Sequence, residues 1–223
     1  MTKLNKLVNI FLDPVAVFEE LRENKDWIFP LIIVLIAALI SSLLIYNVIT
    51  SDEFMEEIQR EMEAEMPAGQ EMDMSYMNIV YFFSTVLLGL LVTVGAYLVL
   101  GFFLWLFGKF VGRDIPFSRT FSATIYIGIV GALGSILTAI LVFFQKDPEA
   151  VINLALIFPN LEGVVGTISE QLNIFGLWQA ILFALAVSVF YRLARWKSLV
   201  IVIGIWALFK IAYYFTLAQF LSF

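Results

Sequence analysis

Long apolar runs separated by short polar segments dominate the pattern of this chain. Five runs of 19 to 29 residues carry at most one charge each, at 28–49, 79–107, 121–144, 175–193 and 199–220. A helix of that length crosses the hydrocarbon core of a bilayer, where backbone groups must be satisfied within the protein. The pattern predicts an all-α, polytopic integral membrane bundle of five transmembrane helices, forming a single domain over residues 1–223.

Two shorter helical patterns precede the first span. In the first pattern, apolar residues recur at helical spacing, at Leu4, Leu7, Val8 and Phe11. In the second, Asp13 and Pro14 indicate an N-cap followed by proline at the first helical position. Because charged residues fill the other sides, we expect short amphipathic helices that lie in the membrane interface or pack on the ends of the spans.

Two hydrophilic loops, 50–78 and 145–174, connect the spans. An amphipathic helix is predicted over 51–66, and its polar face carries seven acidic residues against a single arginine. Met72, Met74 and Met77 offer thioethers that suit Cu(I), although a flexible apolar face on an acidic helix is the preferred interpretation. We expect no metal and no cofactor. In the second loop, Asp147-Pro148 predicts the start of a short helix.

Lysine and arginine are distributed unequally between the two ends of the predicted spans. Ten of the 13 fall in segments on one side, two fall in the two long loops, and Lys210 lies within the last span. Cytoplasmic segments of membrane proteins carry the excess of Lys and Arg. The chain is therefore predicted to lie in a cell membrane with a cytoplasmic N-terminus and an extracytoplasmic C-terminus, and with both long loops outside.

Small residues recur at helical spacing in three of the spans, including the first, where Ala37 lies four residues before Ser41 and Ala38 four before Ser42. They allow helices to approach closely in lipid, where no hydrophobic force drives helix association. The 121–144 run is the richest and is predicted to be the central helix. The expected packing positions, which lie four apart or beside such a row, are Gly128, Gly131, Ala132, Ser135 and Ala139, and then Ala180, Ala184 and Ser188.

Composition limits the kinds of chemistry that the side chains of this protein can perform. The chain is 61% hydrophobic, with a mean hydropathy of +0.94, and contains neither cysteine nor histidine. Disulfides, thiolate chemistry and the commonest general base are thereby excluded. Lys210 is the one ionisable residue well inside a predicted span, which makes it a candidate functional residue. It either extends its amine to water or a headgroup, or lines a polar pocket with Gln179 and Tyr126 that holds an anionic or lipid ligand.

Basic residues form a rim at the predicted cytoplasmic ends of the spans. They set topology and contact anionic headgroups, or they dock a soluble or membrane partner. The rim consists of Arg113, Arg119, Arg192, Arg195 and Lys197.

Several short motifs resemble one family. They are Asp13-Pro14 with Trp27 and Pro30; Gly112, Pro116-Phe117-Ser118 and Tyr126; and residues 173–178 with Lys197 before the last span. Together they resemble a prokaryotic member of the Yip (Ypt-interacting protein) membrane family. The resemblance implies a five-helix bundle with a cytoplasmic N-terminus. Eukaryotic members serve vesicle trafficking and bind small GTPases, some bacterial relatives accompany export transporters, and no catalytic residue is established.

These observations favour a non-enzymatic membrane protein that acts as an accessory or scaffolding subunit. Its expected partners are the lipid bilayer and a membrane protein such as an export transporter or an envelope-stress system; nucleic acid is not expected, and a homo-oligomer stays open. The alternative is a small-solute or lipid transporter with a polar pocket around Lys210. An intramembrane enzyme is disfavoured because no span contains an acidic residue for general acid–base work.

Overall fold

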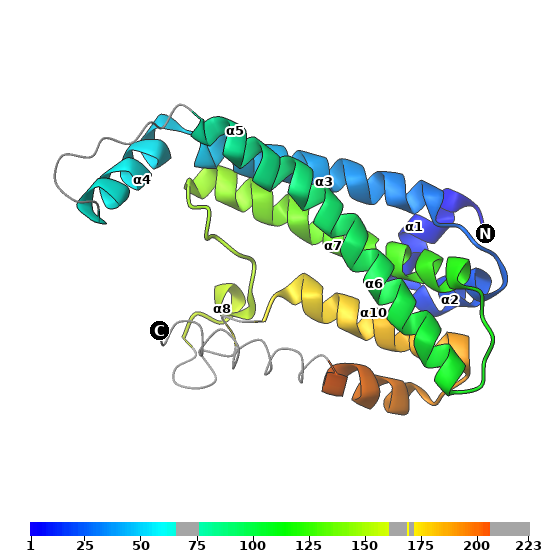
Figure 1. Cartoon of the computed structure of the whole chain (residues 1–223). Coiled ribbons are helices and arrows are strands. Elements are labelled where there is room, and N and C mark those ends of the chain that lie inside the picture. Colours follow the sequence, from blue (N-terminus) through cyan, green and yellow to red (C-terminus); the bar gives the residue numbers. More distant parts are fainter. Residues whose placement is uncertain (66–75, 161–168, 170–171, 206–223) are drawn as a thin grey trace. The chain divides into compact units, whose positions relative to one another are not determined.

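The computed structural model describes residues 1–65, 76–160, 169 and 172–205, and the regular elements within them are helices (Figure 1). In chain order they are α1 (Lys3–Leu12), α2 (Pro14–Glu23), α3 (Ile28–Ile49), α4 (Asp52–Glu65), α5 (Met77–Tyr81), the π-helix η1 (Phe82–Leu88), α6 (Gly89–Phe110), α7 (Phe117–Gln145), α8 (Leu154–Ile157) and α10 (Ile174–Tyr191). Residues 195–205 are also helical. The predicted all-α class is confirmed for this part of the chain.

Four helices are long and apolar enough to cross a membrane. They are Ile28–Ile49, Met77–Phe110, Phe117–Gln145 and Ile174–Tyr191, with mean hydropathies of 3.0, 2.4, 2.5 and 2.0. The first has the predicted bounds, and the next two extend a few residues beyond theirs. Of the fifth predicted span, 199–220, only residues up to 205 are described, and these are helical.

Two short helices precede α3, as the sequence predicted. Thr2 caps α1 by accepting a hydrogen bond from the Asn5 amide at 3.2 Å. Asp13 caps α2 by accepting from the Ala16 amide at 3.3 Å, with Pro14 at the first helical position. The predicted N-cap is therefore confirmed, whereas a position in the membrane interface stays a prediction.

The described residues fall into two compact units, and α3, α6 and α7 each contribute a part to both. Unit 1 contains Met1–Leu31, Tyr97–Gly131 and the described residues from Ile174 onward. Within it, α2 lies against α10, and the edge of the Phe11 ring meets Trp178 with centroids 5.4 Å apart. Residues 120–130 of α7 are all buried, so this half of α7 forms the core of the unit.

Unit 1 is held together by close approaches at glycines. A Cβ added to Gly101 would lie 3.2 Å from the Phe121 backbone, and one added to Gly108 would lie 2.7 Å from the Tyr191 ring. The Tyr191 hydroxyl donates a hydrogen bond to the Leu104 carbonyl. Glycine at these positions of α6 lets the helix approach α7 and α10 closely, as expected for packing in lipid.

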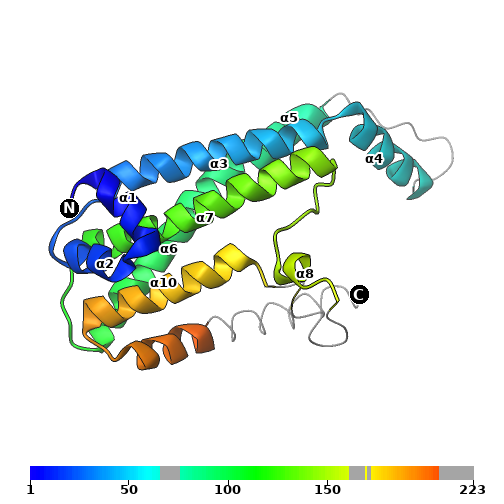
Figure 2. The same cartoon turned by 180° about the vertical axis from the view of Figure 1, so that it is seen from behind.

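Unit 2 contains Ile32–Ala96 and Ala132–Asn173. Within it α3 and α7 run side by side (Figure 2), and the Ser41 hydroxyl donates to the Ser135 hydroxyl at 3.3 Å. Val48 and Val142 pack together with Ala150 in a buried apolar cluster. The acidic helix α4 follows α3 after a break at residues 50–51, close to its predicted bounds of 51–66.

The predicted helix start at Asp147 is wrong. The Asp147 carboxylate accepts from the Glu149 amide at 2.9 Å and closes a local turn instead. The short helix α8 begins later, where Asn153 caps the Leu156 amide at 3.1 Å. Asp and Asn side chains stabilise turns and helix caps alike, so the Asp-Pro pair did not distinguish the two.

The second span contains a feature that the apolar pattern did not indicate. Residues Phe82–Leu88 form a π-helix between α5 and α6. The Ser84 hydroxyl donates to the Tyr81 carbonyl at 3.3 Å beside it. Wider turns of this kind insert a residue into a helix and shift the faces on either side.

Gly128→Ala should destabilise the protein. The new Cβ would lie 2.8 Å from the Tyr97 ring, and this ring is held by a hydrogen bond from Gln179. Overpacking of this kind costs about 1–3 kcal/mol. The measurement is the thermal unfolding midpoint in detergent, followed by tryptophan fluorescence.

Gly95→Ala is the matched control, because no atom lies within 4 Å of a Cβ at Gly95. It should leave the midpoint unchanged or raise it, since alanine is the better helix former. Equal midpoints for the two variants would contradict the close approach at Gly128.

Candidate functional site

The polar pocket predicted around Lys210, Gln179 and Tyr126 lies partly outside the described residues, because Lys210 is not among them. The other two side chains bond to different groups in unit 1. Gln179 Nε2 donates to the Tyr97 hydroxyl and to the Ile127 carbonyl, both at 3.4 Å. The Tyr126 hydroxyl donates to Asp26 at 2.8 Å. A role for Lys210 stays a prediction.

Gln179 occupies a gap that is left by Gly131, one of the predicted small residues. A Cβ at Gly131 would collide with Gln179 Nε2 and would lie 3.0 Å from the Tyr97 hydroxyl. Glycine therefore leaves room for a polar side chain between α6, α7 and α10. The other predicted packing positions described as buried are Ala132, Ala139, Ala180, Ala184 and Ser188. Their role in packing within a bilayer stays a prediction.

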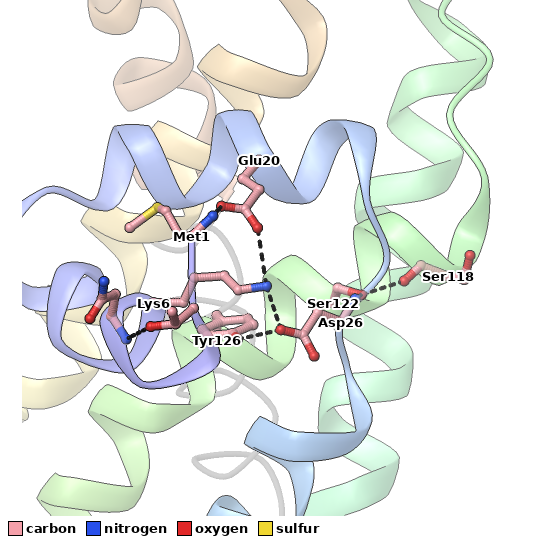
Figure 3. Close-up of polar contacts among 9 residues, drawn as sticks. Met1, Lys6, Glu20, Asp26, Ser118, Ser122 and Tyr126 are labelled. Carbon is pink, nitrogen blue, oxygen red and sulfur yellow. Dashed lines mark hydrogen bonds and ion pairs between the residues drawn. The ribbon is translucent and has the colours of Figure 1, made fainter.

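A compact cluster of charges and hydroxyls joins four segments of unit 1 (Figure 3). Lys6 of α1 is 5% exposed, and its amine lies 2.5 Å from Asp26 and 3.3 Å from Glu20 of α2. Asp26, in the connection before α3, accepts the hydrogen bond from Tyr126 of α7. Its backbone amide donates to Ser122 Oγ at 2.9 Å.

The two carboxylates are held in their charged form. Burial raises the pKa of the Asp26 carboxyl, but the hydrogen bonds from Lys6 and Tyr126 lower it by more, so it lies below its ordinary value of 3.8. Burial likewise raises the pKa of the Glu20 carboxyl. The α-amine of Met1, at 2.6 Å, and the charge of Lys6 outweigh that effect, and the pKa lies below 4.5.

This cluster ties the N-terminal helices to the core helix rather than offering a reactive group. Lys6 and both carboxylates are paired, so their charges satisfy one another inside the protein. The sequence pattern placed Lys6 on the polar side of the first helix and among the ten cations on the predicted cytoplasmic side. The available signal was its spacing, because Lys6 lies one helical turn before Ile10, which is fully buried.

The structure brings together three of the five predicted rim residues. Arg113, Arg119 and Arg192 line one pocket in unit 1, where Arg22 of α2 joins them. Arg195 and Lys197 are not among its lining residues. Arg22 was counted among the ten cations on the predicted cytoplasmic side but was left out of the rim, because spacing along one helix cannot show which other helix end it meets.

Two helix ends next to this pocket each close with a residue in the left-handed conformation, followed by an amide that bonds to the carbonyl five residues before it. After α6, the Arg113 amide donates to the Gly108 carbonyl at 2.8 Å and the Gly112 amide donates to Lys109 at 3.3 Å. This is a Schellman turn with glycine in the left-handed conformation, at φ 68°. After α10, the Leu193 amide donates to the Ser188 carbonyl at 3.1 Å, and Arg192 takes the left-handed position at φ 55°. That conformation costs a residue with a Cβ about 1 kcal/mol relative to glycine.

Asp26→Asn should destabilise the protein by about 2 kcal/mol, because Lys6 loses its closest counter-charge while buried. Glu20 remains 3.3 Å away and limits the loss. The measurement is again the unfolding midpoint in detergent. Asp13→Asn is the matched control, since Asp13 is an exposed N-cap and asparagine caps as well.

The same variant should also change how stability depends on pH. A carboxyl whose pKa is lowered by folding contributes stability above its unfolded pKa, and this contribution is lost as the pH falls through the folded pKa. The unfolding temperature of the wild type should therefore decrease as the pH is lowered below about 4. The decrease should be smaller for Asp26→Asn. Parallel curves for the two proteins would contradict the role given to Asp26.

The model of the Yip1 domain family matches residues 8–216. The matched segment includes Glu20, Asp26 and Tyr126 of the cluster of charges and hydroxyls, and also the arginines of the pocket. Comparisons with curated proteins and with solved structures found no match. Because the matched segment covers nearly the whole chain, and because its apolar helices are those of a membrane protein, the chain belongs to the Yip1 family.

Proposed function

We propose that this protein is a non-enzymatic accessory or scaffolding subunit that binds a membrane-protein partner within the bilayer. The Yip1 family is associated with membrane trafficking, which supports a role in organising other membrane components. The described polar groups that bond across unit 1 are satisfied by one another, as structural contacts are. An export transporter or an envelope-stress system is the kind of partner that the family resemblance suggests.

The observation that carries this proposal is the exposure of α6. Only 11% of the most apolar stretch of Met77–Phe110 is buried, against 44% for Phe117–Gln145. Large apolar side chains on α6 are exposed, among them Val99, Phe102 and Phe103. Aromatic residues are enriched in the cores of protein–protein interfaces. A partner helix that packs on α6 would bury this face.

The proposed setting is a cell membrane, with the N-terminus in the cytoplasm and the C-terminus outside. The excess of Lys and Arg on one side of the spans supports this orientation. It places α1, α2 and the turn between α6 and α7 inside, and α4 outside.

A photoreactive benzoyl-phenylalanine in place of Phe103 should give one protein adduct of defined mass in native membranes. Phe103 is 50% exposed on α6, so the probe would face a partner span. The control is the same probe at Phe121, which is 6% exposed and should give only intramolecular products. Lipid adducts alone at Phe103, or adducts only with a second copy of this chain, would contradict an accessory role.

Glu57→Cys should react in intact cells with a maleimide that does not cross membranes, whereas Glu19→Cys should be protected until the membrane is opened. Both side chains are exposed, on α4 and α2, and the chain has no cysteine of its own to give background. Labelling of both variants, or of Glu19→Cys alone, would contradict the proposed orientation.

A further inference from the structure

A pocket of about 370 Å³ lies in unit 1 where three helices end. Its walls come from the end of α2, the turn between α6 and α7, and the end of α10. The volume falls within the range of about 300–1,000 Å³ that is usual for small-molecule sites. Because α6, α7 and α10 are long and apolar enough to span a membrane and have their ends here, we expect the pocket at the level where a bilayer presents its headgroups.

The lining is strongly basic. Arg22, Arg113, Arg119 and Arg192 face two acidic residues, Glu23 and Asp114. Each of these carboxylates has a cation of its own, since Glu23 pairs with Arg22 at 3.2 Å and Asp114 with Lys109. Within the described part of the chain, Arg113, Arg119 and Arg192 have no carboxylate partner. The pocket thus presents uncompensated positive charge.

Two of the guanidinium groups are held in place before any ligand arrives. Arg119 Nη1 donates to the Arg22 carbonyl at 2.9 Å, and Arg22 Nη1 donates to the Val189 carbonyl at 3.2 Å. These bonds cross-link α2, α7 and α10, and they leave other N–H donors of both forks available. A guanidinium whose orientation is fixed loses less side-chain entropy when it binds an anion.

The backbone at Arg192 supports a function for its side chain. The equivalent position of the neighbouring turn is Gly112, which suits the left-handed conformation, whereas Arg192 adopts it with a long side chain. A residue that is unfavourable for the turn but lines a basic pocket is consistent with selection for its charge.

We propose that this pocket binds the phosphate group of an anionic phospholipid such as phosphatidylglycerol. Guanidinium forks match phosphate oxygens in geometry and charge. Exposed aromatic residues flank the lining residues in sequence, with Phe110 before Gly112 and Trp196 after Arg192, as expected where a protein meets lipid. The lipid would be a bound structural component, which goes beyond the proposed partner-binding role and does not depend on it.

The test is native mass spectrometry of the detergent-purified protein titrated with phosphatidylglycerol or with phosphatidylcholine. Phosphatidylglycerol should bind at least about tenfold more tightly than phosphatidylcholine, and Arg113→Gln combined with Arg192→Gly should remove that preference. Arg192→Gly is chosen because glycine is the residue that best tolerates the left-handed turn, so folding should be retained. Arg195→Gln is the control, as Arg195 is exposed and is not among the lining residues.

The possible outcomes separate the sources of phosphate. Full displacement of phosphatidylglycerol by millimolar inorganic phosphate would identify a soluble anion and overturn the lipid assignment. An equal loss of binding in Arg195→Gln would show attraction by net charge alone, and equal binding of the two lipids would show that the pocket does not select for charge. Either result would overturn the proposal, as would unchanged binding in the double variant. Loss confined to that variant would support it.

Discussion

A buried ammonium group needs a carboxylate beside it, and the pairing of Lys6 with Asp26 meets this requirement in unit 1. Asp26 also accepts from the Tyr126 hydroxyl and donates its own amide proton to Ser122. One residue in a short connection therefore links α1 to the core helix α7. Glu20 completes the link to α2. These contacts act together with the buried apolar side chains of α2 to hold both N-terminal helices, and directed bonds fix a helix face more uniquely than apolar packing alone.

The core helix α7 packs against α6 and α10 through a different kind of contact. Lipid tails are as apolar as the side chains that face them, so no hydrophobic force drives helices together in a bilayer. Helices associate there through close packing and through hydrogen bonds between polar groups. Gly128 and Gly131 of α7 provide the close contact, because they leave room for the Tyr97 ring and the Gln179 amide. The hydrogen bond between these two side chains then connects α6 to α10 across the glycines. Small residues and buried polar groups thus act as a pair.

The ends of the helices are where charge collects. The last carbonyls of a helix have no amide partner in a following turn. The Schellman turn after α6 and the related turn after α10 supply such amides. Both turns lead into arginine-bearing segments, and the start of α7 adds Arg119. Basic residues at the ends of spans orient a membrane protein. When three ends converge, the same residues also form a site that attracts anions.

Some elements of the fold could be predicted from the sequence and others could not, and the reasons are physical. Four of the spans follow from length and hydropathy, since a run of about 20 apolar residues has few alternatives to crossing a bilayer. The bounds of α3 and the Asp13 cap were likewise predictable, because they depend on local sequence. The helix at Asp147 was mispredicted because Asp-Pro serves turns as well as caps. The π-helix Phe82–Leu88 left no trace in an apolar run.

The candidate sites show the same division. The sequence identified Arg113, Arg119 and Arg192 as basic residues at helix ends, and Gly128 and Gly131 as packing positions, because composition and helical spacing carry that information. It did not place Arg22 with the other three arginines or Lys6 beside Asp26. Lys6 is 20 residues from Asp26, and Arg22 is more than 90 residues from each of the other three arginines. Sequence by itself determined that this protein lies in a membrane as a helical bundle, and the tertiary structure alone decided which charges meet, since contacts between distant segments depend on how helices pack and not on their periodicity.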